Sequence, residues 1–116
     1  MLGEVWLSWY PKQDKPDELM RRPSIIVGET DDLVLAIKLT KEEKRKNDAF
    51  DTTVEDWEDA GLYMPSTARV STVQNIPKSQ LIHKLGSLNE GDESRVAEAL
   101  DRYLLSKMKK ANKEKK

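Results

Sequence analysis

Two arginines stand directly in front of an apolar, β-branched run in the segment RRPSIIVG, residues 21–28. The run predicts a buried strand, and Pro23 biases Arg22 toward extended backbone at the entrance to that strand. A planar guanidinium in this position can bind a phosphate through two parallel hydrogen bonds and stabilise charge that develops on it. Arg22 is therefore the first candidate for an anion site, with Arg21 beside it.

A hydroxyl and further cations occur in two other predicted strands. Thr40 ends the apolar segment LVLAIKLT, next to Lys41. A strand-end hydroxyl beside cations can hold a phosphate oxygen or a nucleophilic hydroxyl. Arg69 and Ser71 stand two positions apart in STARVSTVQNI, so they share one face of a strand and can extend an anion groove.

These residues also have purely structural interpretations. Arg22 can pair with a carboxylate such as Glu4 or Glu18. Thr40 can simply cap the loop that follows it, and the residues of the later strand can face water. A single histidine, His83, is more typical of a structural than of a catalytic position. The residues alone therefore predict an anion site on a small β-rich domain and leave its use open.

Composition excludes several kinds of site. The chain has no cysteine and one histidine, which excludes disulfides, a thiol nucleophile and a zinc site built on two or more histidines. We expect no metal and no cofactor. No apolar stretch approaches the ~20 residues of a membrane helix, and the N-terminus lacks a signal-peptide pattern, so we expect a cytoplasmic protein without a membrane partner.

The charge is unevenly distributed. The last ten residues hold six lysines and one glutamate, so a formal net charge of −1 for the chain leaves −6 on residues 1–106. An acidic body is not typical of a general nucleic-acid binder, and any RNA contact needs a local basic patch. We expect one domain over residues 1–108 and a lysine-rich, frayed helix end at 109–116, with a polyanion-binding arm as the alternative.

The hydropathy pattern predicts short strands joined by turns and short helices. The expected strands are 3–10, 24–29, 33–40, 66–76 and 83–88, and a twelve-residue polar loop fills 11–22. Residues 53–62 predict a short helix, with Thr53 as N-cap, Asp56 as its capping-box partner and Gly61 at its end. This order predicts a mainly β fold with helices (α+β), as a small barrel or curled sheet of antiparallel strands. A final amphipathic helix is expected from Asp92 to about residue 108.

Five segments stand in the order GEVWLSWYP, RRPSIIV, LAIKLT, DWEDAGLYMPSTARV and NIPKSQLIHKLGSL, before the terminal helix. This series, which covers residues 3 to about 104, resembles the MazF/PemK family of toxins from bacterial toxin–antitoxin systems. The most telling pair is GL-x-x-PS-x-x-R with the later LGSL.

The resemblance implies an SH3-like β-barrel that works as a homodimer and cuts single-stranded RNA such as mRNA without a metal. In that chemistry the RNA's 2′-hydroxyl attacks the adjacent phosphate, which gives a 2′,3′-cyclic phosphate and a 5′-hydroxyl. Arg22 and Thr40 match the family's catalytic positions, and Arg69 matches an active-site arginine of its PemK-like branch. We expect Arg21, Lys41, Arg69 and Ser71 to bind the RNA. The resemblance also implies a cognate antitoxin, whose acidic or amphipathic tail would cover the arginines.

Three departures from the family pattern keep other functions open. The segment DKPDELMRRP lacks the glycine of the G-x-E turn that the family often has before its arginine and proline. Ser71 stands where the PemK-like branch has an aspartate, and Lys41 stands where a serine often follows the threonine. The main alternative is a catalytically impaired barrel that binds RNA or a protein. A topoisomerase-poisoning toxin on a related barrel is a further alternative, which the arginine–proline and threonine pair disfavours.

Overall fold

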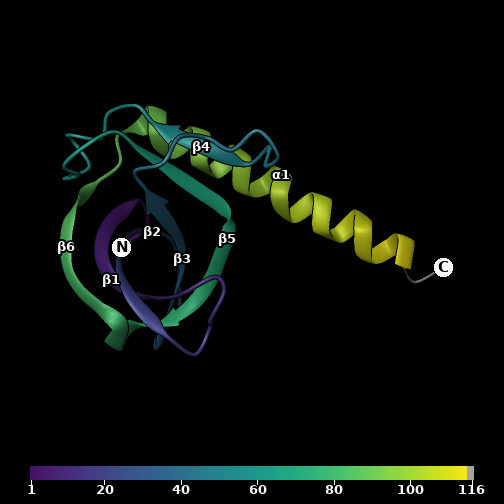
Figure 1. The fold of residues 1–116 in the computed structure, drawn as a ribbon, viewed down its shortest axis with the longest axis horizontal. Coiled ribbons are helices and arrows are strands. Elements are labelled where there is room, and N and C mark those ends of the chain that lie inside the picture. Colours follow the sequence, from purple (N-terminus) through teal and green to yellow (C-terminus); the bar gives the residue numbers. More distant parts are fainter. Residues whose placement is uncertain (115–116) are drawn as a thin grey trace.

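The computed structural model describes residues 1–114, with side chains described through residue 111. Strands are the main elements of the chain, a short 3-10 helix precedes the last strand, and a long helix ends the fold (Figure 1). The elements are β1 Glu4–Pro11, β2 Leu19–Glu29, β3 Leu33–Thr40, β4 Asp51–Val54, β5 Ser66–Pro77, η1 Lys78–Gln80, β6 Leu81–Ser87 and α1 Glu90–Glu114.

The six strands form one antiparallel sheet in the order β4-β5-β3-β2-β1-β6. The sheet curls into a ring, and α1 crosses one side of it (Figure 1). Register shifts between Ile26 and Gly28 in β2 and between Ala36 and Lys38 in β3 accompany the curl, because β-bulges increase local twist. The predicted α+β class, with antiparallel strands and a C-terminal helix, is confirmed.

The curled sheet does not close into a complete barrel. Within residues 1–114 no strand pairing joins the two edge strands, β4 and β6. Residues 55–62 pack against β6 instead, and the two backbones approach so closely that only glycine fits at the contact. A Cβ at Gly61 would lie 2.0 Å from the carbonyl oxygen of Leu85, and a Cβ at Gly86 would lie 2.6 Å from the backbone of Ala60. This contact between a turn and a strand replaces the strand-to-strand pairing that would close the ring.

The predicted helix at 53–62 is wrong. Residues 51–54 form β4, which pairs with β5, and turns follow to Gly61. The N–H groups of Glu55 and Asp56 donate to the buried carboxylate of Asp92 at 2.9 Å each, so a residue of α1 caps this segment from a distance. The contact with Asp92 therefore replaces the local capping box that the sequence pattern predicted. Gly61 does have the positive φ, 78°, expected of a glycine that ends a helix or turn.

The predicted loop at 11–22 is shorter than expected, because β2 begins at Leu19. The N–H of Lys12 donates to the carbonyl of Glu18 at 2.9 Å and closes the loop at its base. β1 and β2 then pair from Pro11 onward, which places Arg22 opposite Ser8 inside a continuous ladder. Pairing with β1 thus extends β2 through a stretch whose proline and charges had predicted a loop.

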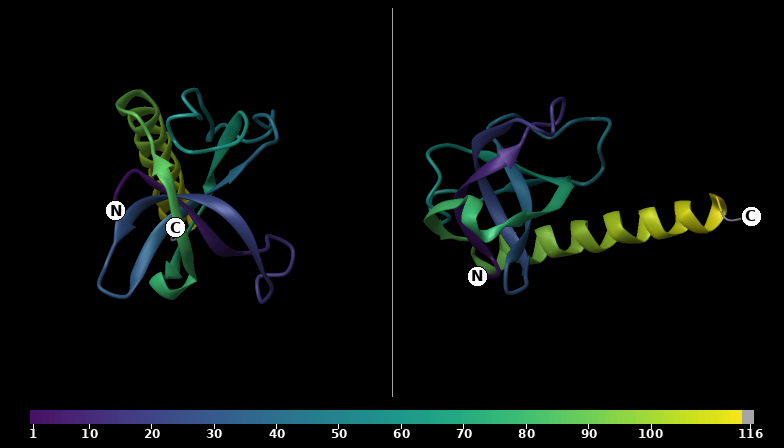
Figure 2. Two further views of the ribbon diagram at one scale, coloured as in Figure 1. Left: turned by 90° about the vertical axis from the view of Figure 1, so that its left-hand side faces the viewer. Right: turned by 90° about the horizontal axis from the view of Figure 1, so that it is seen from below.

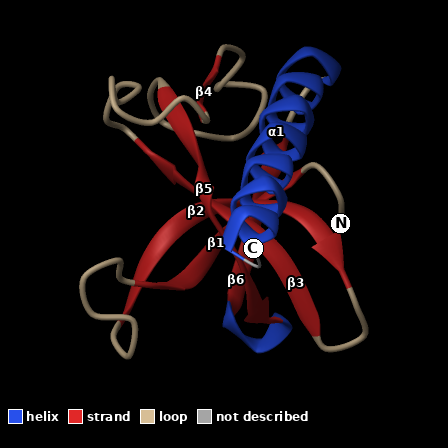
Figure 3. Ribbon diagram, turned by 90° about the vertical axis from the view of Figure 1, so that its right-hand side faces the viewer, coloured by secondary structure: helices blue, strands red, loops and turns tan. Residues whose placement is uncertain are grey.

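Helix α1 is longer than predicted and only its first half packs on the sheet. Val96 and Ala99 are buried in the main core, while Leu104, Leu105 and Met108 are exposed. The second half projects away from the sheet (Figure 2), and Figure 3 shows the helix passing in front of the strands from that end. The expected lysine-rich tail is helical as far as Glu114, and its last two residues, 115–116, lie outside the described residues. No helix in the described part of the chain is both long and apolar enough to span a membrane.

Candidate active site

Cations from three neighbouring strands and one loop converge on a single cavity. It has a volume of about 310 Å³. Its lining residues are Gln13, Arg22, Lys38, Thr40, Glu42, Arg45 and Arg69. Lys38 pairs with Arg69 across β3 and β5 and with Ser24 across β3 and β2, so strand register alone brings the cations of β2, β3 and β5 together.

Arg22 has a buried guanidinium nitrogen that the fold leaves unsatisfied. Its Nε is buried and has no hydrogen-bond partner, and no ion pair to Arg22 occurs among the side chains described, those of residues 1–111. The carboxylates considered as its structural partners bind elsewhere: Glu4 to Lys84 and Glu18 to Lys12. A half-buried guanidinium without a protein partner is available to an anion.

Arg69 is nearly buried and is held by two carboxylates. Its Nη2 lies 2.7 Å from Glu42 Oε2, and its Nη1 lies 3.5 Å from Asp51 Oδ2. Asp51 faces Arg69 across β4 and β5 and is itself buried. The side chain of Glu42 is 74% exposed, so a phosphate can compete with Glu42 for Arg69 far more easily than with Asp51.

Arg45 is held by hydrogen bonds to two aspartates, Asp48 and Asp51. Its N–H and Nε donate to Asp51 Oδ2 at 2.9 and 3.0 Å, and its Nη2 donates to Asp51 Oδ1 and Asp48 Oδ2 at 2.9 and 2.8 Å. Burial by itself would raise the pKa of Asp51, but the hydrogen bonds from Arg45 and the charges of Arg45 and Arg69 outweigh it and hold that pKa below its ordinary value. The loop at 41–50 is thereby pinned to β4.

Lys38 is surrounded by other cations. Burial lowers the pKa of its ammonium below the ordinary value, and the positive charges of Arg69, Arg22 and Arg45 lower it further. The positive charges of the three arginines that disfavour the protonated form of Lys38 also favour a bound anion. It also makes Lys38 a better proton donor than a solvated lysine.

Thr40 caps the following loop and also lines the cavity. Its Oγ1 accepts a hydrogen bond from the N–H of Glu42 at 3.3 Å, so it caps the start of the following loop. The same side chain lines the cavity beside Arg22 and Lys38. The cap holds the hydroxyl at the cavity wall.

The remaining predicted residues lie outside this cavity. Arg21 is exposed, and strand alternation puts it on the face opposite to Arg22. Lys41 is also exposed and borders a different hollow, with Pro65 and Thr67. Ser71 lines the neighbouring cavity and donates to Asp48 Oδ2 at 2.6 Å.

Four lining residues were not predicted as site residues from the sequence: Gln13, Lys38, Glu42 and Arg45. A single charge inside the apolar strand LAIKLT was a usable signal for Lys38. Arg45 lies in a run of mixed charges, where nothing local distinguishes it from its neighbours.

The sequence profile of one family matches nearly the whole chain. It is described as the PemK-like, MazF-like toxin of type II toxin–antitoxin systems, and it matches residues 2–104. The chain belongs to this family. No curated protein sequence matches the chain. The PemK-like match confirms the resemblance seen in the five ordered segments.

Solved structures of toxins share the fold. The Mycobacterium tuberculosis toxin MazF-mt6 superposes with a TM-score of 0.69 at 21% identity, over 87% of this chain and 95% of that chain. A second structure, of an Mtb toxin, gives a TM-score of 0.60 at 24% identity, over 71% and 91%. An endoribonuclease in complex with its cognate antitoxin from Mycobacterial species gives 0.65 at 16% identity, over 90% and 93%. At these identities the similarity establishes the PemK-like fold.

Proposed function

We propose that this PemK-like toxin is a metal-independent endoribonuclease that cuts single-stranded RNA. The observation that carries the proposal is Arg22, whose buried Nε has no partner, in a cavity that also holds Lys38 and Arg69. Several cations around one cavity suit a phosphodiester, and they suit still better the extra negative charge of a phosphorane.

The reaction needs no group beyond this chain and the RNA. The 2′-oxygen attacks phosphorus, the bond from phosphorus to the 5′-oxygen breaks, and the products are a 2′,3′-cyclic phosphate and a 5′-hydroxyl. We assign Arg22 to the non-bridging phosphate oxygens and Thr40 to hydrogen bonding with one of them. Arg69 stabilises the same charge once the phosphate displaces Glu42.

Two lining residues are suited to the proton transfers. Glu42 carries the only carboxylate among the described residues that line this cavity, and it would accept the proton of the 2′-hydroxyl. Lys38, whose pKa is lowered by burial and by the neighbouring arginines, would donate a proton to the departing 5′-oxygen. The two roles can be tested by separate mutations, because Lys38 lies in β3 and Glu42 lies in the loop that follows it.

The test is incubation of the purified protein with a long single-stranded RNA in EDTA. Discrete fragments with 5′-hydroxyl and 2′,3′-cyclic phosphate ends are expected. Arg22→Ala should reduce the rate by about 10²–10³-fold, whereas Arg21→Ala removes the same charge outside the cavity and should cost far less. Intact RNA with a folded protein would contradict the proposal. Tight RNA binding without cleavage would favour the impaired barrel instead, a reading motivated by Ser71 in place of an aspartate.

We also propose that the toxin is a homodimer in the cytoplasm and is neutralised by a cognate antitoxin. One structural neighbour is an endoribonuclease bound to its antitoxin. Carboxylates of an acidic antitoxin segment would compete directly with phosphate for Arg22 and Arg69. In a co-expressed complex, Arg22 should be protected from guanidine-directed labelling, and labelling equal to that of the free toxin would refute this mode. Sedimentation of the free toxin tests the dimer.

A further inference from the structure

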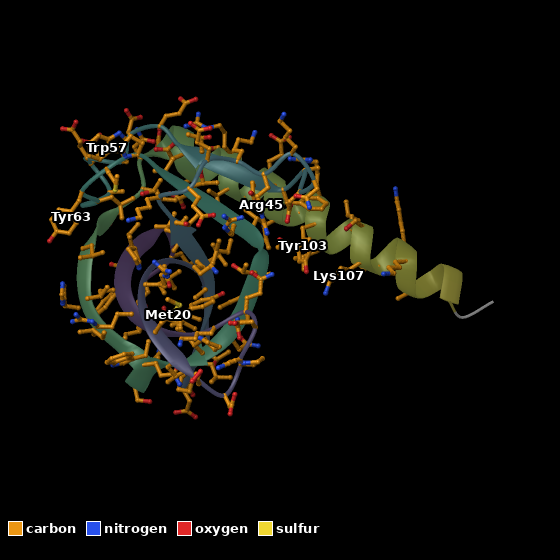
Figure 4. All side chains as sticks on the ribbon, in the orientation of Figure 1. Met20, Arg45, Trp57, Tyr63, Tyr103 and Lys107 are labelled. Atoms are coloured by element: carbon orange, nitrogen blue, oxygen red, sulfur yellow. The ribbon has the colours of Figure 1, made fainter. Side chains whose placement is uncertain are left out.

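A second cavity lies next to the candidate active site, on the side where α1 leaves the sheet. Its volume is about 370 Å³, and it shares Gln13 and Lys38 with the first cavity. Figure 4 shows Arg45, Tyr103 and Lys107 along this same side of the molecule. An RNA strand bound at Lys38 in the first cavity can therefore extend directly into the second.

The second cavity carries positive charge without a carboxylate on its walls. Lysines from three elements line it: Lys12 from the loop after β1, Lys38 from β3 and Lys107 from α1. None of its described lining residues is an aspartate or glutamate. The pair that Lys12 forms with Glu18, at 3.7 Å, is solvent-exposed and easily exchanged for another anion.

The other walls suit a flat, partly polar group. Pro11, Pro16, Val73 and Tyr103 provide apolar surface, and Gln13 supplies an amide with both a donor and an acceptor. The size falls within the ~300–1,000 Å³ range of ligand sites. Lysines for a phosphate, an aromatic ring for a base and an amide for a base edge are the groups that bind a nucleotide.

The ring and the lysine from α1 are held in place before any ligand arrives. The rings of Tyr103 and Phe50 form a T-shaped pair, with centroids 5.3 Å apart and an interplanar angle of 73°. Nζ of Lys107 lies 5.3 Å from the centroid of the Tyr103 ring. Both side chains lie at the point where α1 leaves the sheet, so the helix presents them at the cavity mouth.

From this arrangement we infer a subsite for one RNA nucleotide next to the reacting phosphate; the inference rests on the proposed function. Lys12 and Lys107 bind the phosphate of that nucleotide, and its base packs against Tyr103. The projecting helix α1 thus takes part in substrate binding.

Binding is measured by fluorescence anisotropy with a short 2′-O-methyl oligoribonucleotide, which cannot be cleaved by attack of its 2′-oxygen. Lys107→Glu is expected to weaken binding about tenfold. Lys109→Glu makes the same charge change on the same helix but lines neither cavity, and it serves as the matched control. Lys107→Ala should also reduce the slope of log K against log salt by about 0.7, the value for one lost contact to a single strand.

A second pair of variants tests the ring. Tyr103→Leu keeps an apolar side chain against Phe50 but removes the stacking surface, and it should weaken binding by a similar factor. Tyr103→Phe should restore most of that loss, because the ring remains. In cleavage assays both Lys107→Glu and Tyr103→Leu should raise KM more than they lower kcat, and the effect should be larger for a long RNA than for a dinucleotide.

The outcomes separate this inference from the proposed function. If the wild type binds but does not cleave, the nuclease proposal fails, while a selective loss in Lys107→Glu still supports the subsite. If the wild type cleaves and Lys107→Glu behaves like Lys109→Glu on every substrate, the subsite is refuted and the nuclease proposal stands. Absence of both binding and cleavage overturns the two together.

Discussion

Glu42 Oε2 and Arg69 Nη2 lie 2.7 Å apart, in an ion pair between a carboxylate that is mostly in solvent and a guanidinium that is almost buried. Both side chains line the candidate active site. The carboxylate of Glu42 occupies the guanidinium of Arg69, which a phosphate of the RNA would otherwise bind. The site therefore contains its own weak competitor.

Replacing Glu42 should change binding and turnover in opposite directions. Glu42→Gln is expected to tighten binding of uncleavable RNA by about 2–5-fold, because an exposed ion pair contributes up to roughly 1 kcal/mol. The same change should lower kcat by about 10²-fold, since the proposed proton acceptor is lost. Glu43→Gln is the control, because Glu43 is exposed and lies outside this cavity. An unchanged kcat would remove Glu42 from the mechanism.

The buried carboxylate of Asp51 should be important for stability. It is the shared partner of Arg45 and Arg69, whose side chains are 29% and 7% exposed. Asp51→Asn removes the buried carboxylate that the two guanidiniums share and leaves each with one carboxylate partner, Glu42 or Asp48, so we expect the free energy of unfolding to fall by about 3 kcal/mol. Urea denaturation measures the change. Asp59→Asn, at an exposed position, should alter stability by less than about 0.5 kcal/mol, and a similar effect of both variants would contradict the prediction.

The same carboxylate predicts a pH dependence. The pKa of Asp51 is lower in the folded chain than its ordinary value of about 3.9. Its contribution to stability is therefore complete above the unfolded pKa and is lost as the pH falls through the lower, folded pKa. The stability difference between wild type and Asp51→Asn should be constant near neutral pH and shrink below about pH 4. A difference that persists unchanged at pH 2 would show that the loss in Asp51→Asn is not due to charge.

Two glycines should respond to alanine with opposite signs. Gly61 has φ of 78°, and a Cβ there would lie 2.0 Å from the carbonyl oxygen of Leu85, so Gly61→Ala should destabilise the fold by more than about 2 kcal/mol. Gly91 lies in the first turn of α1, and its nearest atom to a new Cβ is 3.5 Å away, on the flexible side chain of Arg95. Gly91→Ala should therefore stabilise by roughly 0.5–1 kcal/mol. Thermal unfolding of both variants tests the pair, and a stable Gly61→Ala would show that residues 55–62 can move away from β6.

Local pattern was sufficient for much of this molecule. Alternating and apolar runs predicted the strands near 3–10, 33–40 and 66–76, because side-chain periodicity in a strand depends only on the strand itself. Arg22 before Pro23 and Thr40 at a strand end were recognisable as anion-binding candidates from neighbouring residues. The absence of cysteine and the single histidine restricted the chemistry to arginine, lysine, hydroxyl and carboxylate groups.

The tertiary structure decided which of those candidates meet. Lys38 lies beside Arg69 because of the register between β3 and β5, and Arg45 reaches the site because Asp51 in β4 holds it. Both facts depend on contacts between segments far apart in the chain, which no local pattern encodes. The helix signal at 53–62 failed for the same reason, since Asp92 and the pairing of β4 offered its backbone better partners than a local helix. Residue types thus set the available chemistry, and long-range pairing chose the residues that carry it.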